Sequence, residues 1–198
     1  MPHNFNSKGV PILENNADPN LLDLVKFLEI SGILKRTQRT GWVDIGVCAP
    51  ESVADHTFRM AILCMLYADR NNLDTSKMLK MALIHDLPEA IIGDLMPSQK
   101  NAKTKKDEKD AICEILSLLP EKQKAEYYAI WMEYQQGETK EAKAARQLDK
   151  IEMTLQAKEY EKMGHDKKSL ERFVNSAQQF TEWSDLKRLL ECILEEKK

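Results

Sequence analysis

Apolar residues recur at helical spacing along most of the chain. In residues 21–34 they stand three and four positions apart, which predicts a helix with one apolar stripe: Leu21, Leu24, Val25, Leu28 and Ile33. Further helices are predicted at about 53–69, 78–86, 105–119, 121–135, 139–163, 168–180 and 183–196. Seven Gly and seven Pro are too few and too scattered for a sandwich of many short strands. The fold class is therefore predicted to be all-α.

Two local signals set boundaries in the middle of the chain. Ser52-Val53-Ala54-Asp55 has the form of a capping box, which starts a helix and places His56 in its first turns. Pro88 has no N–H for the helical ladder, so the chain must kink or restart near it. The segment KRTQRTGWVDIGVCAPE (35–51) has no convincing period and is predicted to be a loop.

The length of 198 residues fits one domain. We expect a single compact multi-helix bundle over residues 1–198, with its core at about 18–180. About 15 N-terminal residues are expected to be flexible, and the C-terminal helix is expected to pack on the core.

The charge balance and the lengths of the apolar runs limit the kinds of partner and location that the chain can have. Lys+Arg is 29 and Asp+Glu is 32, a balance that does not indicate a nucleic-acid polymer or an anionic membrane as partner. The apolar run AILCMLYA (61–68) is too short to cross a bilayer. No signal peptide is visible and the four cysteines form no CxxC pair, which predicts a soluble cytoplasmic protein with reduced thiols. The charged segment QKNAKTKKDEKD (99–110) is interpreted as a solvated loop and helix start, with a phosphate clamp as the alternative.

The stretch LIHDLPEAIIGDL (83–95) contains four ionisable residues among apolar ones: His85, Asp86, Glu89 and Asp94. Charged groups are costly to bury unless something compensates them. Imidazole and carboxylate are natural ligands of divalent ions such as Mn²⁺, Fe²⁺, Co²⁺ and Mg²⁺. His85 and Asp86 diverge by about 100° on a regular helix, so both reach one ion only near a distortion such as Pro88 supplies.

Two more ligands are expected from distant helices. His56 lies early in a helix with an apolar face, and Asp149 lies beside the apolar stripe of AARQLDKIEMTLQA. Taken alone, His56 is more often a hydrogen-bonded core histidine and Asp149 a half-exposed acid. The pair His165-Asp166 follows Gly164 in a polar turn and is interpreted as surface. The hypothesis of a metal site therefore depends on the ordered set of His56, His85-Asp86 and Asp149.

At these residues the sequence resembles the HD-domain metal-dependent phosphohydrolase superfamily, whose ligands run His, His-Asp, Asp in this order. RTGWV (39–43), PESVADHTFRMA (50–61), ALIHDLPEAIIGDL (82–95) and QLDKIEMTLQAKEYE (147–161) are similar to its 5′-deoxynucleotidase branch. The resemblance covers about residues 18–180. It implies an HD-domain fold, a divalent metal ion (Mn²⁺, Co²⁺ or Mg²⁺), hydrolysis of deoxyribonucleoside 5′-monophosphates, and a homodimer.

The resemblance also implies residue roles. It makes His56, His85, Asp86 and Asp149 the metal ligands. Glu89 matches the catalytic glutamate and Asp94 the substrate-side aspartate, a pair that some descriptions of the family assign to a second metal. Arg39 matches the phosphate-binding arginine, and Trp42 the tryptophan near the sugar, although Thr40 and Gly41 here separate two residues that bacterial relatives have adjacent.

Alternatives remain open from the residues themselves. Glu89 read singly is an exposed helix acid, Asp94 a cap, Arg39 a surface residue and Trp42 a core anchor. Apolar residues of the late helices, around Phe173, Phe180, Trp183 and Leu190, belong either to a dimer interface or to the core. The alternative functions are an HD-type phosphohydrolase or phosphodiesterase acting on another phosphorylated metabolite, and a non-catalytic helical scaffold.

Overall fold

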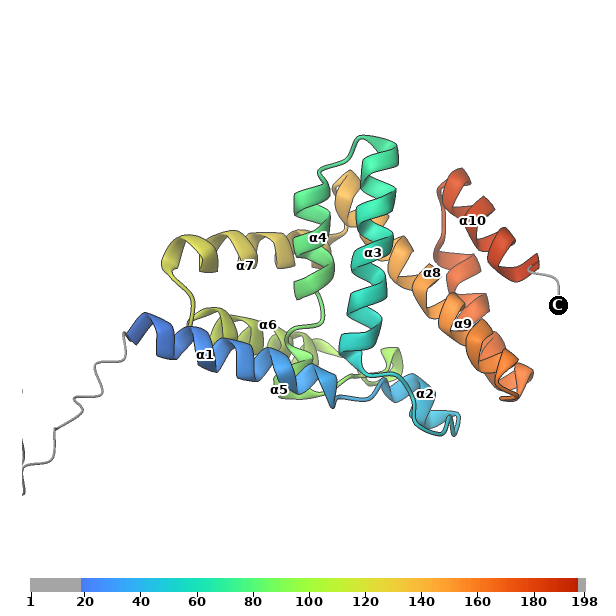
Figure 1. The fold of residues 1–198 in the computed structure, drawn as a ribbon, viewed down its shortest axis with the longest axis horizontal. Coiled ribbons are helices and arrows are strands. Elements are labelled where there is room, and N and C mark those ends of the chain that lie inside the picture. The colour runs from blue at the N-terminus through green and yellow to red at the C-terminus, as the bar shows by residue number, and fades with distance from the viewer. Residues whose placement is uncertain (1–18, 196–198) are drawn as a thin grey trace, which may run out of the picture.

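The computed structural model describes residues 19–195 and is built from helices (Figure 1). The elements follow in the order α1 (Pro19–Ser31), η1 (Gly32–Lys35), α2 (Thr40–Asp44), α3 (Val53–Asn71), α4 (Thr75–Ile84), α5 (Glu89–Ile92), η2 (Pro97–Gln99), α6 (Ala102–Leu116), α7 (Glu121–Gln136), α8 (Lys140–Lys162), α9 (Lys167–Phe180) and α10 (Ser184–Glu195). The elements η1 and η2 are 3-10 turns. The all-α prediction is confirmed.

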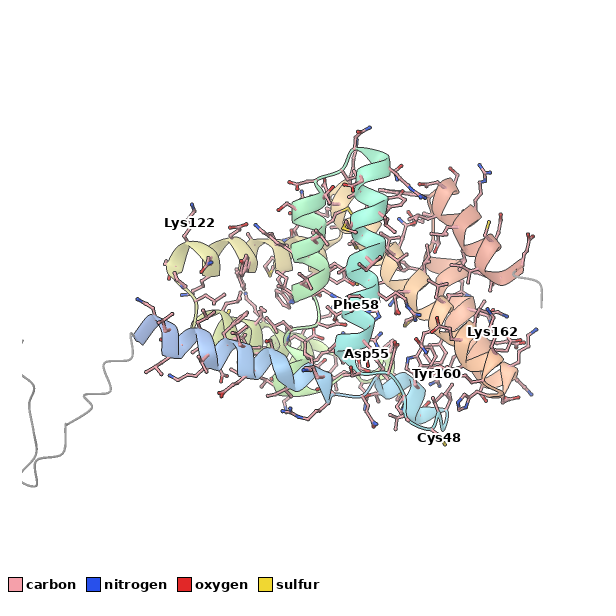
Figure 2. The ribbon with its side chains drawn as sticks, viewed as in Figure 1. Cys48, Asp55, Phe58, Lys122, Tyr160 and Lys162 are labelled. Carbon is pink, nitrogen blue, oxygen red and sulfur yellow. The ribbon has the colours of Figure 1, made fainter. Side chains whose placement is uncertain are left out.

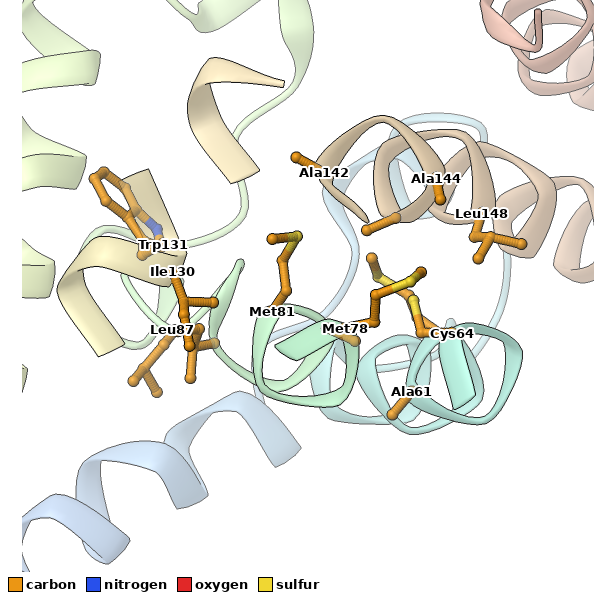
Figure 3. Packing of buried hydrophobic residues seen from close by; sticks show 14 of the residues in the cluster. Ala61, Cys64, Met78, Met81, Leu87, Ile130, Trp131, Ala142, Ala144 and Leu148 are labelled. Atoms are coloured by element: carbon orange, nitrogen blue, oxygen red, sulfur yellow. The ribbon is translucent and has the colours of Figure 1, made fainter. Parts of the chain in front are cut away.

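Helices α3, α4 and α8 form the centre of the bundle. α3 and α4 are joined by a short turn and pack along each other, and α8 packs on both of them and also on α7, α9 and α10 (Figure 1). Figure 3 shows Met78 of α4 close to Cys64 of α3 and Met81 pointing toward Ala142 of α8, with Ala144 and Leu148 of α8 on the same side. Buried alanines on α8, such as Ala142, Ala144 and Ala145, let neighbouring helices approach closely.

Local capping explains where the helices begin. The Ser52 hydroxyl accepts a hydrogen bond from the Asp55 N–H, and the Asp55 carboxylate accepts one from the Ser52 N–H at 2.9 Å, so the predicted capping box is confirmed. α4 begins earlier than predicted because Asp74 caps it through the Lys77 N–H. α6 begins at Ala102 because Asn101 caps it, so the charged segment 99–110 is mostly helix rather than loop.

Two features of the N-terminal part differ from the sequence prediction. The segment 35–51 contains the short helix α2, whose Thr40 N–H is bonded to the Asp94 carboxylate, 54 positions along the chain; a local pattern cannot show such a contact. Four of the five residues of the predicted apolar stripe are exposed, whereas the fifth, Ile33 in η1, packs on the core. Leu21, Leu24, Val25 and Leu28 are 42–59% exposed, and the side chains of α1 that pack on the core are Phe27 and Ile30.

The late helices belong mainly to the core. α10 inserts Leu186, Leu190 and Ile193 into it. Trp183 packs against the same core, while Phe180 is 37% exposed. The expectation of a flexible N-terminus falls on residues outside the described part of the chain. Within residues 19–195, none of the helices has both the length and the apolar character that crossing a bilayer requires.

Candidate metal centre and active-site cavity

The His-Asp turn lies where α4 ends. His85 is the C-cap of α4 and its N–H still bonds the Met81 carbonyl, after which Pro88 starts the short helix α5. The imidazole Nδ1–H donates to the Ala82 carbonyl at 2.7 Å, so the lone pair on Nε2 is free. That Nε2 is buried without a hydrogen-bond partner, although it lies 2.9 Å from Asp86 Oδ2. The two side chains thus point toward a common place.

Helix α7 packs against the His-Asp turn and supports it. The Trp131 indole N–H donates to the His85 carbonyl at 3.2 Å, which satisfies an acceptor left open at the helix end. One turn later, the ring of Tyr134 packs on the His85 imidazole with 5.0 Å between centroids. Together these contacts fix both the backbone and the ring of His85.

His56 comes from the first turns of α3, where the capping box places it, and is fully buried. Its Nδ1–H donates to the Glu152 carboxylate. Its Nε2 has no hydrogen-bond partner but lies 3.3 Å from Asp149 Oδ1 and 3.8 Å from Asp86 Oδ2. Burial and Arg39 lower the pKa of His56, but Glu152 and Asp149 raise it more, to about 9.

The predicted ligands therefore converge from two helices, α3 and α8, and from the C-terminal end of α4. Ligand atoms of His56, His85 and Asp86 lie within 4.8 Å of one another, and Asp149 of α8 joins them through its contact with His56. Burial raises the pKa of Asp86, but His85 and Arg39 outweigh it and hold the pKa below its ordinary value. Two buried imidazole nitrogens without partners, next to two carboxylates, form a donor set that suits a divalent ion.

The other predicted site residues surround this group. Arg39 Nη1 lies 3.3 Å from Asp86 Oδ2 and 3.7 Å from Asp94 Oδ1. The Asp94 Oδ2 accepts the Thr40 N–H at 2.5 Å, and the Thr40 hydroxyl donates to the Asp94 carbonyl at 2.7 Å. Asp94 thus caps α2 and also faces Arg39. It therefore fits both interpretations made from the sequence, as a helix cap and as a residue of the site.

Glu89 is buried in the first turn of α5, and its Oε2 has no hydrogen-bond partner. Burial, and then the neighbouring Asp86 and Asp94, raise the pKa of Glu89 well above its ordinary value. The interpretation of Glu89 as an exposed helix acid is therefore wrong. An unpartnered carboxyl oxygen in this place is free to bond a water molecule or a ligand.

Trp42 is buried, with only 1% of its surface exposed. Its Nε1–H donates to Glu51 Oε1 at 2.8 Å, and its ring packs against Phe173 and Tyr160, with centroids 4.0 and 5.3 Å away. It nevertheless lines the same cavity as the residues above. Trp42 is thus both a core anchor and part of the cavity wall.

The cavity has a volume of about 610 Å³, which is large enough for a nucleotide-sized ligand. Among its lining residues are Arg39, Trp42, Asp86, Glu89, Tyr134 and Lys150. Lys150 pairs with the adjacent Asp149, with 2.9 Å between Nζ and Oδ2. The cavity therefore places cationic, acidic and aromatic groups around one space.

The sequence interpretation missed Glu152, Lys150, Trp131 and Tyr134. Glu152 carried a usable signal, because it stands three residues after Asp149 among apolar residues and so shares its helix face. Lys150, Trp131 and Tyr134 carried none, because charged and aromatic residues on a helix are usually surface or core.

Comparison with known proteins agrees with this geometry. The HD domain family matches residues 31–187. The 5′-deoxynucleotidase HDDC2 of Xenopus laevis is 40% identical over 176 residues, which cover 88% of this chain and 87% of the relative. The human 5′-deoxynucleotidase HDDC2 is 43% identical over 155 residues, 77% of this chain and 76% of the relative. The solved structure of a conserved hypothetical protein from Pyrococcus furiosus superposes with a TM-score of 0.71 at 35% identity, covering 86% of this chain and 98% of that one. The chain belongs to the HD domain family.

Proposed function

We propose that the chain is a metal-dependent phosphomonoesterase that hydrolyses deoxyribonucleoside 5′-monophosphates to deoxyribonucleosides and phosphate. The observation that carries the proposal is the pair of buried, unpartnered Nε2 atoms of His56 and His85 beside Asp86 and Asp149. The relatives named 5′-deoxynucleotidase, at 40% and 43% identity, support the class of substrate. The domain responsible would be a single HD domain over residues 1–198, with its core at about 18–180, on which α10 packs.

His56, His85, Asp86 and Asp149 would hold one divalent ion. Two nitrogen and two oxygen donors suit Mn²⁺, Co²⁺ or Mg²⁺. Such an ion supplies positive charge at the phosphoryl oxygens and lowers the pKa of a bound water. The fit is good because a buried ring nitrogen without a partner costs about 1–3 kcal/mol, a cost that a ligand bond removes.

Arg39 would bind the phosphate. Its guanidinium stays charged at every working pH and presents a planar set of donors that matches phosphate oxygens. Its contacts with Asp86 and Asp94 hold the side chain beside the metal ligands. The phosphate would therefore meet Arg39 and the ion together.

Glu89 would accept the proton of the attacking water, and Asp94 would contact the sugar or the leaving oxygen. The unpartnered Oε2 of Glu89 can orient the attacking water and accept its proton. Asp94 uses Oδ2 to hold Thr40, and its Oδ1, 3.7 Å from Arg39 Nη1, would face the 3′-hydroxyl or the leaving 5′-oxygen. If a second ion binds, these two carboxylates would be its ligands.

Trp42 would exclude ribonucleotides. A bulky indole in the cavity wall leaves no space and no hydrogen-bond partner for a 2′-hydroxyl. The contacts of Trp42 with Glu51 and Phe173 keep the indole rigid, which such exclusion requires.

The function is tested by measuring phosphate release from the four deoxyribonucleoside 5′-monophosphates and their ribose counterparts. We expect hydrolysis of the deoxy substrates that a chelator abolishes and that Mn²⁺ or Co²⁺ restores. Cyclic nucleotides and bis-p-nitrophenyl phosphate serve as diester controls. Faster turnover of a diester, or activity that survives the chelator, would contradict the proposal.

Replacement of Glu89 separates catalysis from metal binding. We expect Glu89→Gln to keep the ion and to lower the rate of phosphate release by about 10²–10⁴-fold, because the proton acceptor is lost. The matched control is Glu121→Gln, the same chemical change at a side chain that is 82% exposed. Metal analysis and turnover are measured on both variants; loss of the ion from Glu89→Gln would make Glu89 a ligand instead.

The role of Trp42 is tested by Trp42→Phe rather than by alanine, because truncating a buried Trp to Ala costs about 3–5 kcal/mol. We expect the ratio of kcat/KM for dAMP to that for AMP to fall, by up to about 10²-fold, the discrimination that a pocket achieves against an added hydroxyl. Trp183→Phe, at a half-buried indole outside the cavity, is the control. An unchanged ratio in a folded Trp42→Phe protein removes Trp42 from the specificity.

We also propose a homodimer that uses the exposed apolar side chains of α1 and α3. Leu28 of α1 is 57% exposed, and Phe58 of α3 is 69% exposed (Figure 2). The turn η1, which continues α1, packs against α3, so η1 links the two helices that carry these side chains. An exposed apolar stripe of this kind is typical of an interface.

Light scattering after size exclusion tests the dimer. We expect the mass of two chains for the wild type and of one chain for the double variant Leu28→Glu, Phe58→Glu, because a charge buried in the interface has no partner. Leu189→Glu, at a 37% exposed position of α10, should remain dimeric. A monomeric wild type refutes the dimer, and a dimeric double variant refutes this surface.

A further inference from the structure

Glu152 is a fully buried carboxylate on α8, one helical turn after Asp149. Its Oε2 accepts the Nδ1–H of His56, and its Oε1 accepts the Nε–H of Arg59 at 2.8 Å. Both oxygens are therefore engaged within the described chain. The carboxylate lies behind His56, on the ring edge away from Asp86 and Asp149.

The hydrogen bond between His56 Nδ1 and Glu152 decides which ring nitrogen of His56 is available to a metal ion. As a metal ligand, an imidazole that donates from Nδ1 carries no proton on Nε2 and has its lone pair there, on the atom that points toward Asp86 and Asp149. His85 is set in the same way, but by the carbonyl of Ala82. A carboxylate is a stronger acceptor than a carbonyl and makes the ring a more basic ligand.

A purely structural role for Glu152 would be an ion pair with Arg59. Arg59 has other partners, because Nη1 bonds Glu159 at 2.7 Å and Nη2 bonds Gln156 at 2.6 Å. Arg59 is also partly exposed, whereas Glu152 is not. Burying a carboxylate only to hold an arginine that is already held would cost desolvation with little return.

Glu51 is a further acid near His56 and Glu152, and it also contacts Trp42 of the cavity wall. One of its carboxylate oxygens lies within 4.8 Å of ligand atoms of His56 and Glu152. Its Oε1 accepts the indole N–H of Trp42, and the Nδ1 of His56 is already bonded. These acids therefore support two functional side chains from behind.

We propose that Glu152 is a positioning residue that fixes His56 with its proton on Nδ1 and its Nε2 toward the metal. The inference rests on the proposed function only in that His56 is a metal ligand. Glu152 itself touches neither the ion nor the substrate.

The test compares Glu152→Gln with Glu159→Gln, which removes a different partner of Arg59. Mn²⁺ affinity is measured by calorimetry on metal-free protein, and thermal unfolding of the metal-free protein checks the fold. We expect Glu152→Gln to bind Mn²⁺ about 10–100-fold more weakly, and Glu159→Gln to bind it like the wild type. Unchanged affinity in a folded Glu152→Gln protein overturns the proposal, and equal weakening in both variants assigns the effect to Arg59 and also overturns it.

A second measurement needs no variant and decides the matter if Glu152→Gln does not fold. Nitrogen-15 NMR of the wild type loaded with Zn²⁺ should show His56 carrying its proton on Nδ1 in a strong hydrogen bond. The Nδ1–H of His85, which bonds a carbonyl, is the internal comparison: a proton on Nε2 of His56, or a His56 hydrogen bond no stronger than that of His85, would overturn the proposal. A wild type that binds no metal refutes the proposed function as well, whereas normal metal binding with an unaffected Glu152→Gln refutes only the role of Glu152.

Discussion

Several ionisable side chains are buried together where α3, α4 and α8 meet. Their removal from water costs free energy, and the contacts of the surrounding structure compensate this cost. A buried charge or ring nitrogen is tolerated only when each of its polar atoms has a partner. The Nδ1 atoms of His56 and His85 have theirs, in Glu152 and the Ala82 carbonyl. Their Nε2 atoms do not, so the unsatisfied bonding capacity is concentrated at one point beside two carboxylates.

The opposite wall of the cavity depends on Asp94. Its carboxylate holds the first amide of α2, and α2 carries Arg39 at its N-cap and Trp42 one turn later. The helix has five residues, too few to be stable without external contacts. Arg172 of α9 adds another, from its guanidinium to the Gly41 carbonyl at 2.9 Å. The two proposed substrate residues are thus placed by side chains far away in sequence.

The difference between contacts of near neighbours and contacts of distant segments explains what could be predicted from the sequence. Periodicity, the capping box and Pro88 act between near neighbours, so the helices, the placement of His56 and the break after Asp86 followed from the sequence. The ordered motif identified the group of His56, His85, Asp86 and Asp149 that the structure brings together. Contacts between distant segments could not be inferred: α2 was expected to be loop, Glu152 went unnoticed, and the stripe of α1 was assigned to a helix without revealing that most of it is exposed.

Metal binding and folding are coupled in such a centre. An ion that binds only the folded chain stabilises it by RT ln(1 + [L]/Kd), about 2.7 kcal/mol when its concentration is a hundred times Kd. The metal-free chain must instead accommodate the same acids with Arg39, which lies against Asp86 and Asp94. Under the proposed function, Arg39 would thus be a counter-ion before the substrate arrives and a phosphate ligand afterwards. A phosphate that binds Arg39 must compete with these carboxylates, and an ion at Asp86 weakens that competition by taking up its charge. The proposed metal and phosphate sites therefore favour each other's occupation through one shared carboxylate.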